Sequence, residues 1–293
     1  MYDFILQVTN IDKQFPGVHA LKDVSFSVLR GEVHGLIGEN GAGKSTLIKS
    51  ITGAYSYDSG SIIFIDETGT QFKIHNPSDA KAAGIAAAYQ DLLAAPELTV
   101  GENFFLGRIP KTSLGAVDWS YIYQYSSKIL REYGISVDPR KKMRQLTVSQ
   151  QMMVTIAKLS SEHAKLIIFD EPTALLPNQE VQTFYKILRK LRANGVSMIY
   201  VSHRLEEILE VCDRVTVLKD GAIVGTKETS SVTEGMLISM MVGRSMSDIY
   251  QINKGVPGAE VLRVEHLTRK NSFSDISFSL HKGEVLGFFG LIG

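Results

Sequence analysis

The feature that most constrains this chain is a glycine-rich segment, Gly38-Glu39-Asn40-Gly41-Ala42-Gly43-Lys44-Ser45. It fits the pattern G-x-x-x-x-G-K-[ST] and lies between a strand-like run, Val33 to Ile37, and a helix-like run, Thr46 to Thr52. Glycines in this context let successive backbone N–H groups surround phosphate oxygens, and the following helix directs its positive end to the same place. The lysine can reach the β- and γ-phosphates, and the serine can hold Mg²⁺. A turn with a chance lysine is the alternative, which the full spacing disfavours.

A second candidate is an apolar strand that ends in two carboxylates. Leu166 to Phe169 is followed directly by Asp170 and Glu171, which is the Walker B pattern. Asp170 is expected to belong to the Mg²⁺ shell, and Glu171 to accept a hydrogen bond from the attacking water. The alternative is two solvated carboxylates at a strand end, which is disfavoured because the same chain carries the phosphate loop.

Three further residues are candidates for the site only because of their positions in the chain. Gln90 follows a predicted buried strand, Ile85 to Tyr89, where an amide could ligate Mg²⁺ and orient water. His203 ends the strand after the Walker B unit and could contact the γ-phosphate, although an isolated histidine is more often structural. Phe15 is expected either to stack on an adenine ring or to be an ordinary core phenylalanine, and the sequence does not choose between them.

The alternation of strand-like and helix-like runs predicts an α/β fold with a mostly parallel sheet. Residues from about 98 to 162 interrupt this alternation and are typical of helices. Thr99 with Glu102, and Thr147 with Gln150, form capping boxes that predict two of the helix starts. The dipeptide Asp220-Gly221 predicts a hairpin between two short apolar runs.

Composition excludes several classes of protein. The 293 residues suggest about two domains. The 31 basic residues balance 31 acidic ones, so the chain has no excess of positive charge to attract nucleic acid. A single cysteine, Cys212, allows no internal disulfide and suits a reducing compartment. The sequence has no signal-peptide pattern and no apolar run near the ~20 residues of a membrane helix. We therefore expect a cytoplasmic chain that reaches a membrane only through a partner.

An internal repeat lies at the C-terminal end. When residues 273–293 are placed on residues 21–41, ten of the 21 positions are identical, including Gly31/Gly283, Glu32/Glu284 and Gly38/Gly290. The preceding residues, 243–258, are rich in glycine, serine and polar side chains, which is typical of a linker. The chain is therefore expected to hold one domain over 1–242 and the incomplete start of a second over 259–293.

The order of these motifs resembles the ATPases of ABC transporters. The sequence is most similar to tandem-domain ATP-binding subunits of bacterial monosaccharide importers, of the ribose, galactose and xylose type. The segments that carry the resemblance are the phosphate loop, Gln90, Leu146-Thr147-Val148-Ser149-Gln150, residues 167–173, residues 73–80, residues 98–108, residues 202–208 and residues 241–244. The resemblance implies a P-loop NTPase fold with an antiparallel β subdomain and a helical subdomain at about 98–162.

The resemblance also implies cofactors and site residues. ATP and Mg²⁺ are the expected cofactors, with Glu171, His203, Gln90 and Lys44 as catalytic residues and Ser45, Gln90 and Asp170 at the metal. The residues expected to bind ATP are Phe15, Gly38, Glu39, Asn40, Gly41, Ala42, Gly43, Lys44, Ser45, Thr46, Thr147, Ser149 and Gln150.

The implied partners follow from the same resemblance. They are transmembrane permease subunits, a second ABC domain in the same chain or a homodimer, and indirectly a periplasmic or lipid-anchored sugar-binding protein, with no nucleic acid. The implied location is the cytoplasmic face of the membrane. Two alternatives stay open: a soluble ABC ATPase of translation or DNA maintenance, and a regulatory nucleotide-binding module without turnover.

One departure from the family pattern bears on mechanism. The family signature Leu-Ser-Gly-Gly-Gln is Leu146-Thr147-Val148-Ser149-Gln150 here, so both glycines are replaced. In the family this signature completes the nucleotide site of the opposite domain. We therefore expect asymmetry, with the Lys44 site catalytic and the opposite site impaired, and weak or no hydrolysis by this chain alone.

Overall fold

The computed structural model describes residues 4–89, 94–162, 164–174, 176–243, 257–270 and 272–289. It divides into two compact units, Met1–Gly243 and Arg244–Gly293, and each is described by itself. Gln90 and most of the expected linker lie outside the described residues. Within the described residues, no helix combines the length and the apolar character needed to cross a membrane.

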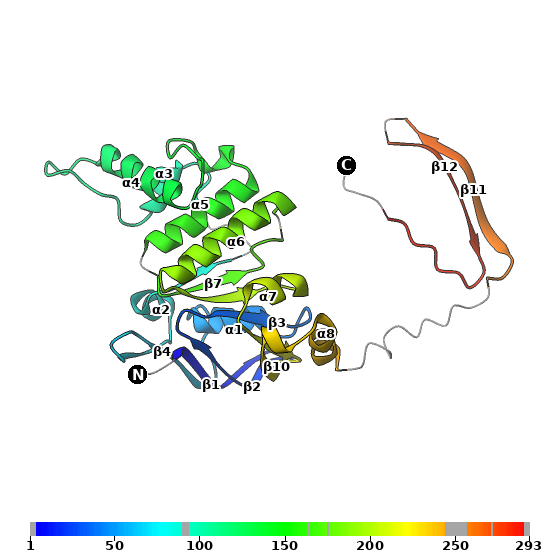
Figure 1. Cartoon of the computed structure of the whole chain (residues 1–293), viewed down its shortest axis with the longest axis horizontal. Helices are drawn as coiled ribbons and strands as arrows, with labels where there is room; N and C mark the ends of the chain where they lie inside the picture. Colours follow the sequence, from blue (N-terminus) through cyan, green and yellow to red (C-terminus); the bar gives the residue numbers. More distant parts are fainter. Residues whose placement is uncertain are drawn as a thin grey trace. The chain divides into compact units, whose positions relative to one another are not determined.

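The first unit is built on two sheets (Figure 1). An antiparallel sheet has the order β2-β1-β4-β5, and a mostly parallel sheet has the order β10-β9-β3-β8-β7-β6, in which only the β9–β10 pair is antiparallel. The strands of the first sheet are β1 (Phe4–Phe15), β2 (Val18–Leu29), β4 (Ser59–Ile65) and β5 (Gln71–Lys73). Those of the second are β3 (Val33–Ile37), β6 (Ile85–Ala88), β7 (Leu166–Asp170), β8 (Ser197–Val201), β9 (Arg214–Lys219) and β10 (Ala222–Glu228).

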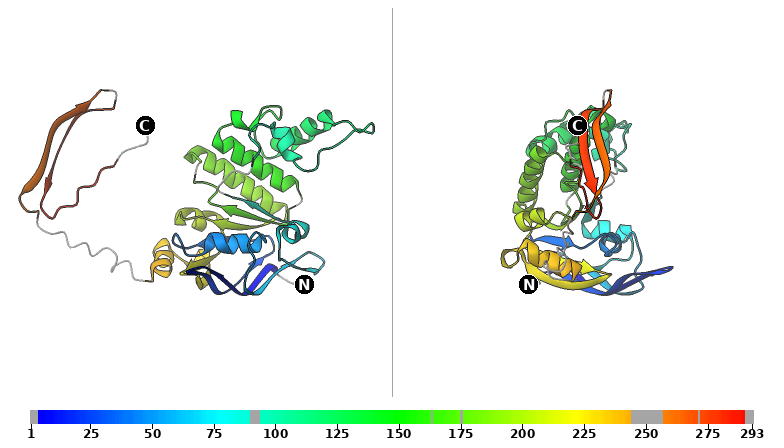
Figure 2. Two further views of the ribbon diagram at one scale, coloured as in Figure 1. Left: turned by 180° about the vertical axis from the view of Figure 1, so that it is seen from behind. Right: turned by 90° about the vertical axis from the view of Figure 1, so that its right-hand side faces the viewer.

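Helices cover both faces of the parallel sheet, as the two views of Figure 2 also show. The α-helices are α1 (Lys44–Ile51), α2 (Pro77–Ala83), α3 (Val100–Phe104), α4 (Trp119–Glu132), α5 (Val148–Ser161), α6 (Asn178–Ala193), α7 (Leu205–Val211) and α8 (Glu234–Val242). The described residues also form the short 3₁₀ helices η1 (Met143–Gln145) and η2 (Thr229–Ser231). The helices α5 and α6 lie on one side of the sheet, and α1 lies on the other, next to the antiparallel strands.

The core explains why the central strands are apolar on both faces. Along β8, Met198 and Tyr200 face the helical side, while Ile199 and Val201 face α1 and the antiparallel sheet. All four are fully buried. A strand buried on both faces has no polar alternation, which is the pattern expected of a parallel sheet between helical layers.

The structure confirms the expected fold class, an α/β cassette with an antiparallel sheet and a helical segment. Both capping boxes are present, at Thr99 with Glu102 and at Thr147 with Gln150. Pro177 is the N-cap of α6, which begins at Asn178. The short α7 has no predicted counterpart.

The second unit contains an antiparallel hairpin, β11 (Glu260–Arg269) and β12 (Phe273–His281). Its pairing repeats that of β1 and β2: Val8 opposite Phe26 corresponds to Val264 opposite Phe278. The hairpin closes at Arg269 opposite Phe273, the equivalent of Lys13 opposite Leu21. The β1–β2 hairpin continues beyond this pair to Phe15 opposite Val18.

Candidate functional site

The phosphate loop connects β3 to α1 and has little room for side chains. Gly41 and Gly43 have φ of 85° and 105°, in the left-handed region that favours glycine. A Cβ at Gly38 would lie 2.2 Å from the carbonyl oxygen of Leu218, and one at Gly43 would lie 2.6 Å from that of Ala20. The close approach of β9 and β2 therefore requires both glycines of the sequence pattern.

Lys44 is held inside this loop. Its Nζ donates hydrogen bonds to the carbonyl oxygens of Gly38, at 2.7 Å, and Glu39, at 3.0 Å. Burial lowers the pKa of the Lys44 ammonium, while the charges of Glu171 and Asp170 act in the opposite direction. The ammonium is thus kept in a pocket that presents carbonyl and carboxylate oxygens.

The two carboxylates follow β7 where it ends beside β8. Asp170 is paired with Val201, and the backbone N–H of Glu171 donates to the Val201 carbonyl at 2.9 Å. Glu171 has φ of 50°, a conformation that non-glycine residues seldom adopt and that is common at functional sites. Burial and the neighbouring Glu171 raise the pKa of Asp170, against the opposing charges of Lys44 and Lys49.

His203 lies next to this pair. Its Nδ1 is 3.2 Å from Oε1 of Glu171, and its side chain is 56% exposed. Because β7 and β8 are neighbours, the loops that follow them bring the two side chains together. The sequence placed both residues at strand ends, and the structure brings them into contact.

A pocket of about 850 Å³ contains most of these groups. Its lining residues are Phe15, Gly17, Val18, His19, Ala20, Lys22, Asn40, Gly41, Gly43, Lys44, Ser45, Thr46, Asp170, Glu171, Asp220 and Gly221. Phe15 is 37% exposed and packs edge-to-face on Tyr55, with 5.6 Å between ring centres, so it is not an ordinary core residue. A larger cavity of about 1030 Å³ lies beside α4 and shares none of these residues.

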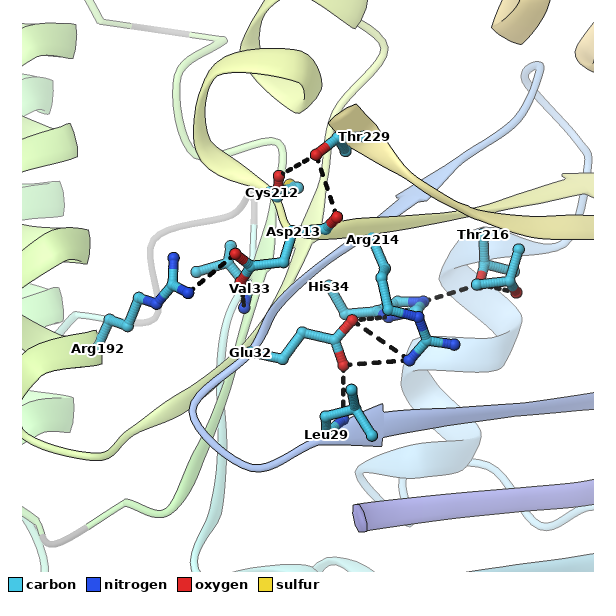
Figure 3. Close-up of polar contacts among 11 residues, drawn as sticks. Leu29, Glu32, Val33, His34, Arg192, Cys212, Asp213, Arg214, Thr216 and Thr229 are labelled. Carbon is cyan, nitrogen blue, oxygen red and sulfur yellow. Dashed lines mark hydrogen bonds and ion pairs between the residues drawn. The ribbon is translucent and has the colours of Figure 1, made fainter. Parts of the chain in front are cut away.

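A buried polar network anchors β3, the strand that leads into the phosphate loop (Figure 3). Oε1 of Glu32 is 2.9 Å from Nδ1 of His34, and the same carboxylate accepts from Leu29 N and lies 3.4 Å from Arg214. His34 Nε2 is 2.7 Å from the hydroxyl of Thr216. These contacts join β3 to β9 and to the end of β2.

The altered signature lies at the start of α5. Thr147 accepts a hydrogen bond from Gln150 N at 3.2 Å, and the Gln150 side chain accepts one from Thr147 N at 3.1 Å. Ser149 is buried. Among the described residues that line the 850 Å³ pocket, none comes from this segment.

Sequence reasoning missed the other pocket residues. His19 and Lys22 come from β2, where alternation signals only a strand. Asp220 was assigned only to a hairpin turn, yet it lines the pocket with Gly221. No local pattern distinguishes these residues, because their place depends on the packing of β2 against the β9–β10 turn.

Comparison with known proteins agrees with this geometry. The model of the ABC transporter family matches residues 21–174, just over half of the chain. A xylose import ATP-binding protein, XylG, from Geobacillus kaustophilus is 44% identical over 100% of this chain and 59% of its own length. A ribose import ATP-binding protein, RbsA 1, from Streptomyces avermitilis is 45% identical over 99% of this chain and 55% of its own length. The chain therefore spans somewhat more than half the length of these curated relatives.

Solved structures show the same fold. The crystal structure of the ADP conformation of MJ1267, an ATP-binding cassette of an ABC transporter, is 27% identical with a TM-score of 0.70, over 82% of this chain and 99% of that one. The structure of cbiO1 from Clostridium perfringens, part of the ABC transporter complex cbiONQ, is 25% identical with a TM-score of 0.67, over 85% and 98%. These matches confirm the resemblance stated from the sequence. The chain belongs to the ABC transporter family.

Proposed function

We propose that the first unit binds and hydrolyses ATP at the site centred on Lys44. The observation that carries this proposal is that one pocket contains the phosphate loop, Asp170 and Glu171. His203, at 3.2 Å from Glu171, completes the group. Each of these features is common alone. Together they supply hydrogen-bond donors to the phosphates, a carboxylate base and, in His203, a further polar contact for the γ-phosphate.

Some residues of the site bind the nucleotide, and others take part in hydrolysis. The loop amides and Lys44 bind the phosphates, in the place where Lys44 now bonds to carbonyl oxygens. Glu171 polarises the attacking water, and His203 contacts the γ-phosphate. Phe15, at the pocket edge, stacks on the adenine ring.

The donor set at the phosphate loop suits Mg²⁺. The hydroxyl of Ser45 and the carboxylate of Asp170 both line the pocket, and oxygen ligands are those that Mg²⁺ prefers. Gln90 is proposed as a third ligand from the sequence alone. When bound, Mg²⁺ would neutralise charge that develops on the phosphates.

We further propose that the second unit begins a second ABC domain, with residues 243–258 as the linker. The matching pairs of the two hairpins support this. In the assembled protein, Thr147, Ser149 and Gln150 would face the nucleotide of that second domain, and the missing glycines would impair that site.

Import of a monosaccharide is the transport function we propose, because relatives at 43–45% identity carry names of xylose, galactose and ribose import. The partners would be permease subunits at the cytoplasmic face of the membrane. A soluble ABC ATPase or a non-hydrolysing module is less well supported, since the charge balance is neutral and Lys44, Asp170 and Glu171 are intact.

The test is sugar uptake in cells that carry the full-length protein. Lys44→Ala should abolish ATP-dependent uptake of the transported monosaccharide, whereas Glu206→Gln, an exposed change on α7, should not alter it. The wild-type protein should copurify with a permease. Copurification with ribosomes or DNA instead, with normal uptake in the Lys44→Ala strain, would refute the proposal.

A further inference from the structure

A buried carboxylate outside the nucleotide pocket, that of Glu207, accepts hydrogen bonds from several side chains. Glu207 on α7 is only 6% exposed. Its oxygens accept hydrogen bonds from the hydroxyls of Thr173, at 2.7 Å to each oxygen, Tyr200, at 2.8 Å, and Ser202, at 3.1 Å. Nη1 of Arg204 adds a contact at 3.3 Å. A buried carboxylate is tolerated when its oxygens are satisfied in this way.

Three of these four donors come from the two loops that carry the reacting groups, and the fourth, Tyr200, lies in β8. Thr173 lies two residues after Glu171, in the loop that follows β7. Ser202 and Arg204 flank His203, in the loop that follows β8. Glu207 therefore joins the loop of the proposed base to the loop of the proposed γ-phosphate contact.

The loop around His203 depends on this anchor. Ser202 Oγ bonds to Glu207 and also accepts from the backbone N–H of Arg204 at 3.0 Å, which turns the chain at His203. The His203 side chain is more than half exposed, so surrounding packing does little to orient it. The direction of the imidazole toward Glu171 must come from its backbone.

We propose that Glu207 is a positioning residue that keeps Glu171 and His203 in their relative places for hydrolysis. This inference rests on the proposed ATPase function of the Lys44 site. Glu207 does not line the nucleotide pocket, so its loss should affect turnover far more than nucleotide binding.

The experiment measures kcat and the Kd for ATP in the full-length protein. Glu207→Gln should lower kcat by about 10- to 100-fold, since small displacements of reacting groups have effects of this size. The Kd should stay within about twofold, because the phosphate loop is untouched. Glu206→Gln, the exposed neighbour, should leave both values unchanged.

A double-mutant cycle separates positioning from general stabilisation. In a His203→Ala background, Glu207→Gln should cause a clearly smaller further loss, because only Glu171 remains of the two groups that it positions. Thr173→Val removes one donor at nearly constant volume and should show a smaller loss with the same non-additivity. If Glu207→Gln does not fold, the Thr173→Val cycle decides the question.

Two outcomes would overturn the inference. One is wild-type turnover in folded Glu207→Gln and Thr173→Val proteins. The other is a loss of the same factor with and without His203, which would show that Glu207 does not act through His203. Wild-type protein that shows no Glu171-dependent hydrolysis would instead refute the proposed function, so the two failures are distinguishable.

Discussion

The hairpins β1–β2 and β11–β12 share a local design but differ in burial. Asn10 and Asp23 have φ near 50°, as do His266 and Asp275 at the equivalent places. Asn10 N donates to Ser25 Oγ at 2.8 Å, and His266 N donates to Ser277 Oγ at 2.9 Å. The same backbone geometry is therefore set by contacts between the two strands of each hairpin.

Burial separates the two hairpins. Leu6 is 0% exposed and its equivalent Leu262 is 47% exposed, while Leu36 is 0% exposed and its equivalent Phe288 is 74% exposed. In the first unit, β4, α1 and the parallel sheet cover the apolar positions. The hairpin therefore forms from its own two strands, whereas the core and the nucleotide pocket require elements far apart in the chain.

In the 293-residue chain, the largest difference should appear when a leucine is replaced by alanine. Leu6→Ala should lower the free energy of unfolding by about 2–5 kcal/mol, the range of large-to-small core changes. Leu262→Ala should change it by less than about 0.5 kcal/mol, as for surface positions. Urea denaturation measures both. Equal losses would show that the two apolar faces are equally covered in solution.

The equivalent glycines Gly35 and Gly287 test the effect of adding a side-chain atom instead of removing one. A Cβ at Gly35 would lie 3.2 Å from Ile208 and 3.3 Å from Cys212, while one at Gly287 would meet nothing within 4 Å. Gly35→Ala should therefore cost about 1–3 kcal/mol through overpacking, and Gly287→Ala should leave the melting temperature unchanged. A stable Gly35→Ala protein would contradict the tight packing of α7 on β3.

The equivalent carboxylates Glu32 and Glu284 should differ in their effect on acid stability. Burial alone would raise the pKa of Glu32, but His34, Leu29 N and Arg214 together hold it below its ordinary value of 4.5. A lowered pKa in the folded state gives stability that is present above pH 4.5 and is lost as pH falls through the folded value.

Glu32→Gln should thus lower the free energy of unfolding by about 1.5 kcal/mol at pH 7. It should also weaken the loss of stability that occurs as the pH falls below 4.5. Hydrogen bonds from the backbone and the side chain of His281 also lower the pKa of Glu284, but both come from one residue in the same turn. Glu284→Gln should therefore change the thermal transition far less than Glu32→Gln. Thermal melts between pH 3 and pH 7 provide the measurement. If the melting temperature of Glu32→Gln falls with acid as steeply as that of the wild type, Glu32 is not the source of this pH dependence.

The smallest effect concerns the shared turn geometry. Asp23 has φ of 52° and accepts a hydrogen bond from Asn10 at 2.6 Å. Asp23→Ala should cost about 1 kcal/mol, since alanine is strained in the left-handed region, and Asp23→Gly should cost less. If alanine and glycine are equivalent there, the backbone is not strained at this position.

Sequence reasoning predicted the local features well. The phosphate loop, both capping boxes and the strand before Asp170 have patterns within about ten residues, and the structure has all of them. The second hairpin has the same pairing as the first, although the repeat read from the sequence includes only its second strand.

The features that sequence reasoning missed depend on distant packing. His19, Lys22 and Asp220 meet only because β2 lies beside the β9–β10 turn, where Lys22 N donates to Gly221 O at 2.7 Å. Glu207 looks like an ordinary helix residue next to Glu206, and only burial distinguishes them. No spacing rule connects Thr173, Ser202 and Glu207.

Glu171 is the base that we propose for the site formed by the first unit. The most direct measurement is kcat for ATP hydrolysis and Kd for ATP in the full-length Glu171→Gln protein. We expect a loss of kcat of about 10²- to 10⁴-fold, the usual contribution of a general base, with ATP still bound. Unchanged turnover in Glu171→Gln would contradict it.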